Sequence, residues 1–321
     1  SSMAEHLYWE VFASLRNLCP SFGRRVRLPG FLGRMNREIS AIDSSTIKLA
    51  LNCIDWAQHR RRKAAAKLHL RLHVSSCLPA FAVVEDAAHH DGVRAEALCA
   101  KLAKGDILVA DRAYNDFLFL AGLDERGVNF VVREKKSMRV EVLQRRSVKH
   151  RRVVSDEIVQ LHVHHTKARY PQALRRIVAQ VEVDGKDIKM AFLTNNLDWS
   201  AWTITEIYKT RWAIEIFFKE LKQTCQIHDF VGYNENAVKW QVWISLLVHL
   251  LLRFIKQVSK WGLSFSRLSG IVRSAIWVKR DLMQILAHYG TAGGRKRDGP
   301  APKPAYIQEL LPLPDLPYGT A

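Results

Sequence analysis

The segment from Tyr208 to Lys222, YKTRWAIEIFFKELK, holds the residues best suited to chemistry. Its apolar residues recur at helical spacing, which predicts a helix of about 3.6 residues per turn. On that helix Tyr208, Arg211, Glu215 and Lys222 share an arc of about 60°. The neighbouring face carries Ile207, Ile214, Phe217, Phe218 and Leu221. We expect a docked helix that presents a carboxylate, two cations and a phenol; the alternative is a surface helix with one weak Arg–Glu pair.

Two further carboxylates, Asp43 and Asp111, lie in apolar segments that are predicted to be strands. An ionised carboxylate in such a setting is costly unless it is paired or binds a metal. Mg²⁺ and Mn²⁺ prefer a few carboxylates together with water and phosphate oxygens. Two such ions, about 3.5–4 Å apart, activate the attacking oxygen and stabilise the leaving oxygen in phosphoryl transfer. Asp43, Asp111 and Glu215 are therefore the candidate ligands of a two-metal catalytic centre.

The spacing of the four polar residues on the predicted helix resembles the Tyr-Arg-Glu-Lys signature of insertion-sequence transposases of the "four" type. The segment IDSST around Asp43 is similar to the first-Asp segment of that family, and ADRAY around Asp111 is similar to the second. The likeness runs from about Trp9 to Arg253. It implies a cut-and-paste enzyme with an Asp-Asp-Glu triad on a ribonuclease-H-like core.

The resemblance also implies roles and partners. The three carboxylates would hold two Mg²⁺ or Mn²⁺ ions, and Tyr208, Arg211 and Lys222 would hold phosphates of the transposon end. The chemistry would be hydrolysis of a DNA strand, followed by attack of the freed 3′-hydroxyl on target DNA. The partners would be double-stranded DNA, as terminal inverted repeats and target, and a second copy of the chain in the DNA complex. The setting would be the cytoplasm and nucleoid of a bacterium.

The charge balance independently favours nucleic acid. The 321 residues include 49 Lys and Arg against 31 Asp and Glu, a net charge of +18, and such a field concentrates polyanions. The basic run HRRRKAAAKLHLR contains further candidate contacts to the DNA backbone, Arg61, Arg62, Lys63 and Lys67. A solvated basic loop is the alternative for this run. For the whole chain the alternatives are a solvated basic surface and a cationic membrane-bound protein.

Cysteine usage and hydropathy indicate a soluble protein of a reducing compartment. The five cysteines form no C-x-x-C pair, which argues against a zinc site and a disulfide framework. The first residues, SSMAEHLYWEVF, do not have the pattern of a signal peptide. The most apolar stretch, VWISLLVHLLL, has 11 residues, fewer than the roughly 20 that a membrane span needs. We therefore expect a buried helix and no membrane partner.

The order of the predicted elements indicates a mixed α/β fold. ISAIDSSTIKL, KLHLRLHVSSC and LPAFAVVEDAA are expected to be adjoining strands, followed by a helix from Asp91 that Asp91 itself caps. DILVADRAY contains the next strand, a short apolar one that ends in Asp111; NDFLFLAGLDERG is a helix that stops at Gly127, and VNFVVRE is a further strand. Three strands, then helix, strand, helix and strand, describe a ribonuclease-H-like mixed sheet.

The domain division follows from changes in pattern. Residues 136–189 are expected to be a basic β-strand insertion, with a hairpin turn at Asp184-Gly185. The remaining ranges are an N-terminal helical remnant (1–38), the catalytic core (39–135 and 190–230), a C-terminal helical region (231–290) and a Pro/Gly-rich tail (291–321).

Three weaker signals have simpler explanations. Asp91, beside His90, is favoured as a helix cap over a metal ligand. His162 and His164 of LHVHH would share one face of a strand, where a polar face is favoured over a metal site. Trp199 and Trp202 could stack on an unpaired base, although packing is the simpler role.

Two rival functions remain open on the sequence alone. Only 42 residues precede Asp43, whereas the resembled transposases carry a helical DNA-binding region before the core. The helix AEHLYWEVFASLRNL presents Leu7, Val11, Leu15 and Leu18 on one side and is expected to pack rather than to read DNA. The first rival is therefore a truncated, non-enzymatic DNA-binding remnant. The second is another ribonuclease-H-like nuclease.

Overall fold

The computed structural model describes residues 2–24, 32–33, 35, 37–49, 58–60, 63–87, 90–183, 185–224, 232 and 234–289. The chain divides into two compact units, residues 1–250 and 251–321, and each is described by itself.

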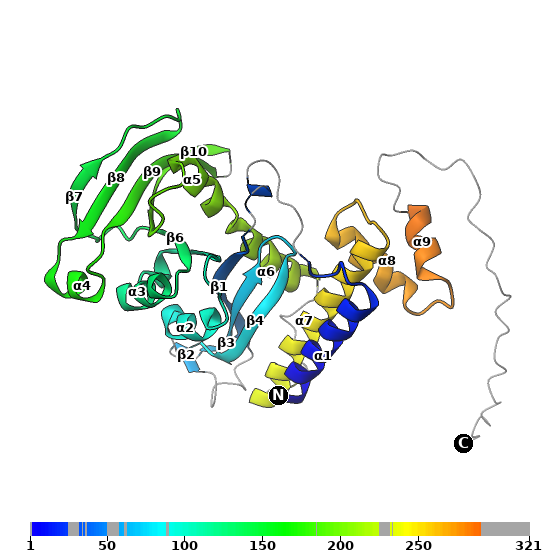
Figure 1. The fold of residues 1–321 in the computed structure, drawn as a ribbon. Helices are drawn as coiled ribbons and strands as arrows, with labels where there is room; N and C mark the ends of the chain where they lie inside the picture. The colour runs from blue at the N-terminus through cyan, green and yellow to red at the C-terminus, as the bar shows by residue number, and fades with distance from the viewer. Residues whose placement is uncertain are drawn as a thin grey trace, which may run out of the picture. The chain divides into compact units, whose positions relative to one another are not determined.

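Figure 1 shows the helices and strands of the chain. The strands are β1 (Ile39–Leu49), β2 (Gln58–Arg60), β3 (Lys63–His73), β4 (Leu78–Asp86), β5 (Ile107–Ala110), β6 (Asn129–Arg133), β7 (Val140–Arg145), β8 (Val153–Leu161), β9 (Leu174–Val183) and β10 (Lys186–Thr194). The helices are α1 (Ser2–Leu18), η3 (Asp91–Arg94), α2 (Ala95–Cys99), η4 (Arg112–Tyr114), α3 (Phe117–Glu125), α4 (His164–Arg169), α5 (Ala201–Lys209), α6 (Trp212–Thr224), α7 (Glu235–Val258), α8 (Phe265–Ala275) and α9 (Leu282–Tyr289).

The centre of the first unit is a mixed sheet. β4, β3 and β1 pair antiparallel, whereas β1, β5 and β6 pair parallel, in the order β4-β3-β1-β5-β6. Three adjoining strands followed by α2, β5, α3 and β6 confirm the predicted ribonuclease-H-like order. Parallel neighbours need a crossover, and α2 and α3 supply the two crossovers.

The predicted insertion continues the same sheet. β10 pairs antiparallel with β6, and β9, β8 and β7 follow in turn, all antiparallel. Lys186 pairs with Val183, and Gly185 has φ +75, so β9 and β10 form a tight hairpin at the predicted turn. Asp184 lies outside the described residues.

Both faces of the central sheet are covered by helices. Leu108 and Ala110 of β5 pack with Leu98, Leu120 and Leu123 of the α2 and α3 crossovers. Side chains alternate along a strand, so the other residues of β5 point to the opposite face, where α5 and α6 lie. The predicted apolar face of that region, Ile207, Ile214, Phe217, Phe218 and Leu221, is buried. These helices therefore hold the predicted polar residues against the sheet.

α1 packs as predicted, but its buried face matches the predicted one only in part. Ala4, Tyr8 and Leu15 are buried, whereas Leu7 is 37% and Leu18 78% exposed. Tyr8 and Trp9 contact Trp243 of α7 with ring centroids 5.6 and 6.4 Å apart. The predicted packing face is thus confirmed at Leu15, and Val11 is half-buried, but it is wrong at Leu7 and Leu18, since the aromatic contacts of Tyr8 and Trp9 turn the helix toward α7.

α7 is the one helix among the described residues that is long and apolar enough to cross a membrane. Of its most apolar stretch of 18 residues, 44% is buried within the protein. The buried face carries a polar contact, because His249 Nε2 lies 3.1 Å from Glu220 Oε2 of α6. A half-buried helix with such a contact is typical of a protein core.

The second unit has its own small core. Trp261, Leu268 and Leu286 are buried together, and Leu263 and Leu282 pack around them. Within this unit α8 begins at the N-cap Ser264, whose hydroxyl accepts a hydrogen bond from the Arg267 N–H.

Candidate active site

Asp43, within β1, and Asp111, directly after the carboxyl end of β5, lie side by side on neighbouring parallel strands. In the β1–β5 pairing Ile42 lies opposite Ala110, so the next residues, Asp43 and Asp111, are neighbours. In the β5–β6 pairing Ala110 lies opposite Val132, and the following residue is Arg133. Adjacent strands are about 4.8 Å apart. The sheet therefore sets two carboxylates and a guanidinium in one row.

The predicted single helix is two helices. α5 ends at Lys209 and α6 begins at Trp212, and the N–H groups of Arg211 and Ala213 bond three residues back, to Tyr208 and Thr210. Such tighter turns change the direction of the side chains. Tyr208 thus lies on α5, Arg211 in the turn and Glu215 on α6, so the predicted common arc on one helix was wrong. Tertiary packing nevertheless brings the three residues to the same place.

Arg211 joins the carboxylates. Its guanidinium donates a hydrogen bond to Glu215 Oε1, 2.5 Å away, and lies 3.7 Å from Asp43 Oδ2. The Tyr208 hydroxyl donates to Asp111 Oδ1 at 3.5 Å, and the Arg211 guanidinium carbon lies 5.6 Å from the centre of the Tyr208 ring. Asp43, Asp111 and Glu215, from β1, the end of β5 and α6, are therefore linked through one tyrosine and one arginine. We call these five residues the carboxylate cluster.

Asp91, which the sequence favours as a helix cap over a metal ligand, lies among polar partners instead. Its Oδ1 accepts hydrogen bonds from Ser44 Oγ at 2.6 Å and from Lys67 Nζ at 3.0 Å. The predicted capping role was wrong, because His90 is the N-cap of η3 and its Nδ1 accepts from the Gly92 N–H. The one signal in the sequence was a carboxylate that closely follows an apolar strand.

Burial and charge shape the titration of the cluster. Burial, with the negative charges of Asp111 and Asp91, raises the pKa of Asp43 to about 6, although the Ser44 N–H and Arg211 oppose the change. Burial also raises the pKa of Tyr208 to about 12. Burial acts to lower the pKa of Arg211, but Tyr208 and Glu215 reverse the effect and raise it. Arg211 is therefore cationic, and its single positive charge does not balance the negative charges of the carboxylates around it.

Lys222 lies on α6, beyond Glu215. Its Nζ donates to the backbone carbonyl of Thr46 in β1 at 3.3 Å. Partial burial and the positive charge of Lys48 lower its pKa. Lys222 is thus held beside the strand that carries Asp43.

The basic run HRRRKAAAKLHLR lies largely on strands in its described residues, and not in the solvated loop that was the alternative. Arg61 and Arg62 lie outside the described residues, and Lys63 begins β3. Lys67 is buried on β3, and its ammonium pairs with Asp91. Lys67 therefore lies beside the carboxylate cluster rather than on a solvated surface.

The weaker candidates take other positions. β8 ends at Leu161, so His162 and His164 are not on a strand as predicted; His164 and His165 begin α4. Among the described residues, no three His, Cys, Asp or Glu side chains stand close enough to form a ready-made metal cage. Trp202 stacks on His150 with ring centroids 3.8 Å apart, which is the packing role expected for it.

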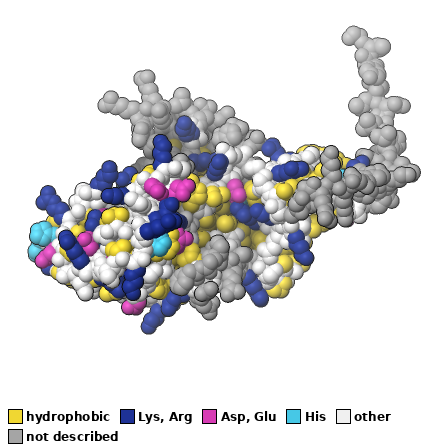
Figure 2. Space-filling model, turned by 90° about the horizontal axis from the view of Figure 1, so that it is seen from above, with side chains coloured by type: hydrophobic (Ala, Val, Ile, Leu, Met, Phe, Trp, Pro, Cys, Tyr) yellow, Lys and Arg dark blue, Asp and Glu magenta, His cyan; other side chains and the backbone are white. Residues whose placement is uncertain are grey.

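Two adjoining hollows, which we together call the basic groove, lie beside the cluster. The first, of about 640 Å³, is lined by residues that include Tyr208, Arg211, Trp212 and Glu215. The second, of about 330 Å³, is lined by Arg112, Arg133, Lys135, Lys136, Arg176 and Lys189, among others. Arg133 and Met190 line both hollows. Lys and Arg side chains are spread over the face seen in Figure 2, with few Asp and Glu between them.

A ribonuclease-H-like sheet with three converging carboxylates beside a basic groove defines a class of nucleic-acid phosphoryl-transfer domains. The model of the family described as "Transposase DDE domain" matches residues 34–251, and the chain belongs to this family.

The chain is 31% identical over 230 residues to a transposase for insertion sequence element IS5377 from Geobacillus stearothermophilus, covering 71% of this chain and 59% of that protein. It is 28% identical over 268 residues to the transposase y4zB from Sinorhizobium fredii, covering 80% and 73%. A solved piggyBac transposase synaptic complex with hairpin DNA is similar with a TM-score of 0.46 and 9% identity, covering 81% of this chain and 56% of that one. The chain thus spans about three fifths of the first relative.

Proposed function

We propose that this protein is a DNA transposase that cleaves a DNA strand at the end of an insertion sequence and joins the freed 3′-hydroxyl to target DNA. The observation that carries the proposal is the convergence of Asp43, Asp111 and Glu215 from three separate elements. The family membership supports the same reading.

The carboxylate cluster fits divalent cations. The three carboxylates have one guanidinium among them, that of Arg211, which contacts Asp43 and Glu215. The pKa of Asp43 is raised to about 6 by burial and by its acidic neighbours. Added positive charge would relieve that repulsion. Oxygen ligands suit Mg²⁺ or Mn²⁺, and Asp43, Asp111 and Glu215 would hold two such ions. When bound, the ions supply charge stabilisation for the attacking and leaving oxygens.

The other residues of the cluster bind and orient the DNA. Arg211 is fixed between Asp43 and Glu215, and its planar guanidinium can donate two parallel hydrogen bonds to an entering phosphate. Tyr208 remains protonated because its pKa is about 12, so its hydroxyl acts as a hydrogen-bond donor. Lys222 adds a point charge beside β1.

The two adjoining hollows provide the path for double-stranded DNA. They pass from Glu215 over Arg133 to Arg112, Lys136 and Lys189. Phosphate contacts of this kind fix the register of a duplex without reading its sequence. A second copy of the chain in the DNA complex, and a cytoplasmic, nucleoid-associated setting, belong to the same proposal.

Joining of DNA tests the function. A duplex that carries the inverted repeat flanking this reading frame, with a free 3′-hydroxyl, is incubated with Mg²⁺ and a supercoiled plasmid. We expect 3′-end joining to the plasmid by the wild-type protein and none by Glu215→Gln. Cleavage without joining would favour another ribonuclease-H-like nuclease. Binding with neither reaction would favour a non-enzymatic remnant.

A further inference from the structure

A third hollow, of about 740 Å³, lies at the start of α5, away from the carboxylate cluster. Its lining includes Arg145, Arg146, Lys149, His150, Ser200 and Trp202. We call it the α5 pocket. None of these residues belongs to the cluster that the proposed function uses.

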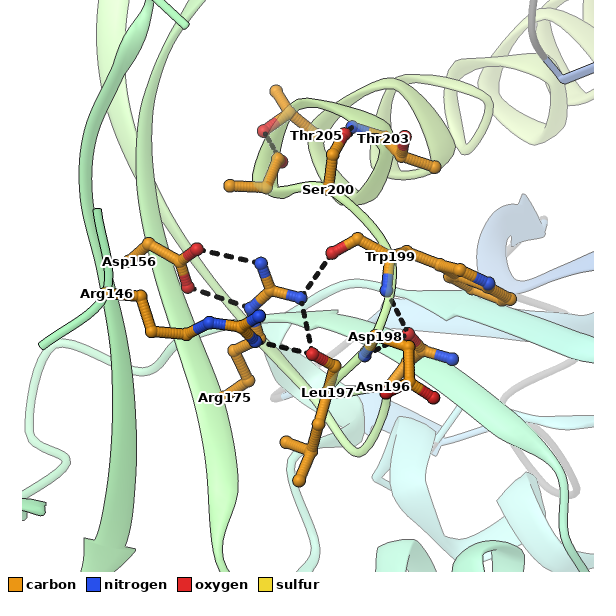
Figure 3. Close-up of polar contacts among 11 residues, drawn as sticks. Arg146, Asp156, Arg175, Asn196, Leu197, Asp198, Trp199, Ser200, Thr203 and Thr205 are labelled. Atoms are coloured by element: carbon orange, nitrogen blue, oxygen red, sulfur yellow. Dashed lines mark hydrogen bonds and ion pairs between the residues drawn. The ribbon is translucent and has the colours of Figure 1, made fainter. Parts of the chain in front are cut away.

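One wall of the α5 pocket is rigid. Arg175 is 1% exposed and donates two hydrogen bonds of 2.8 Å to Asp156, one to each carboxylate oxygen. Its remaining nitrogen donates to the carbonyls of Leu197 and Trp199, and Arg146 donates to Leu197 as well (Figure 3). The loop that leads into α5 is therefore fixed by two guanidinium groups.

The free charge of the pocket is positive. The charge of Arg175 is balanced by Asp156, so Arg175 supports the pocket but offers nothing to a ligand. Arg145 is 83% exposed and forms one long ion pair, with its Nε 3.8 Å from Glu157 Oε1, so its terminal nitrogens remain available to a ligand. Lys149 is exposed, and no ion pair joins it to another described residue. The exposed Asp198 is the one acidic side chain that offsets Arg145, Arg146 and Lys149 in the lining.

Backbone dipoles add to that charge. Ser200 caps α5, and its hydroxyl accepts from the Thr203 N–H. The positive end of the nine-residue helix therefore points toward the same hollow. Cationic side chains and a helix N-terminus together select an anion.

The aromatic ring in the pocket is already in use. Trp202 stacks on His150 at 3.8 Å, and the Lys209 ammonium lies 4.7 Å from the ring centroid. A base could stack on this ring only by displacing His150 or Lys209. The pocket therefore favours a phosphate over an unpaired base.

We propose that the α5 pocket is a second binding site for a backbone phosphate of the DNA; the inference rests on the proposed function. α5 connects the two sites, because Ser200 lines the pocket and Tyr208 lies in the carboxylate cluster. Eight helical steps span about 12 Å. That length equals three to four nucleotides of a B-form strand at roughly 3.4 Å each. The pocket thus holds the strand three to four nucleotides from the bond that is cut.

Salt-dependent binding tests the site without any cleavage. The Glu215→Gln protein binds a fluorescent 30-base-pair duplex, carrying the flanking inverted repeat, in EDTA. Adding Arg145→Ala and Lys149→Ala should make the negative slope of log K against log salt less steep by about two, because two phosphate contacts are lost. The control variant, Lys101→Ala, removes an exposed lysine elsewhere. It should change the slope by no more than about a third of the change in the double variant. An equal slope in the double variant and the control would overturn the proposal.

Ethylation interference locates the contact. Ethylating a phosphate three to four nucleotides from the cleaved bond should weaken binding by the Glu215→Gln protein, and this effect should vanish when Arg145 and Lys149 are alanine. Interference at the cleaved bond itself should persist in both proteins. An unchanged pattern would overturn the α5 pocket alone, whereas loss of plasmid joining by wild type would overturn the proposed function alone.

Discussion

Arg211 links the side chains of the carboxylate cluster. It contacts Glu215 and Asp43 directly, and its guanidinium lies against Tyr208. In the absence of metal it holds two carboxylates that would otherwise repel each other. The consequence is a site whose acidic residues are held in place around a single positive group, Arg211.

The raised pKa of Asp43 has a consequence for stability. The pKa in the folded protein is about 6, above the ordinary value of 3.8. The carboxyl therefore favours folding most below about pH 4, and this contribution is lost as the pH rises through 6. The free energy of unfolding of Asp43→Asn, measured against wild type without metal, should therefore be larger at pH 8 than at pH 4. The difference between the two pH values should be at most about 3 kcal/mol. Urea unfolding in EDTA measures this, and a pH-independent difference would contradict it.

Lys222 is expected to act on DNA and not on metal. Lys222→Ala should lower the salt slope of DNA binding by about one, because one phosphate contact is lost. The affinity for Mn²⁺ should change little, since an ammonium cannot bind a cation. An unchanged slope, matching that of Lys101→Ala, would reduce Lys222 to a support of β1 through Thr46.

At the scale of the elements, the sequence predicted what local pattern controls. The bounds of β1 and the stop of α3 before Gly127, which has φ +69, agree with the structure. β5 ends at Ala110, one residue before its predicted end at Asp111. Periodicity placed Tyr208 and Glu215 on one helix, because the tight turn between α5 and α6 leaves no trace in apolar spacing. The position of Asp91 depends on a contact across 47 residues to Ser44, which no local pattern contains.

Two Arg–Asp pairs in the antiparallel strands allow a matched test of burial. Arg175 and Asp156 are buried, whereas Arg152 and Asp187 are partly exposed, with N···O distances of 2.8 and 3.0 Å. Asp156→Asn should cost about 3–5 kcal/mol, because a guanidinium stays buried without its counter-charge. Asp187→Asn should cost less than about 1 kcal/mol. Chemical unfolding compares them, and equal losses would refute the role of Arg175 as a rigid support.

At the scale of the whole molecule, the charge of +18 favours a long DNA interface. The basic groove and the α5 pocket together offer about six to eight phosphate contacts. The slope of log K against log salt should therefore lie between about −5 and −7. Fluorescence anisotropy from about 0.05 to 0.3 M salt measures it. A slope weaker than about −2 would mean that these surfaces do not contact DNA together.

We propose that Asp43, Asp111 and Glu215 act as one metal-binding unit. The most direct measurement is the rate of Mg²⁺-dependent strand cleavage at the inverted repeat by Asp43→Asn, Asp111→Asn, Glu215→Gln and their pairs. Each single variant should abolish cleavage while the fold and most DNA affinity remain, and pairs should lose no more than singles. A single variant that cleaves at the wild-type rate would contradict the account.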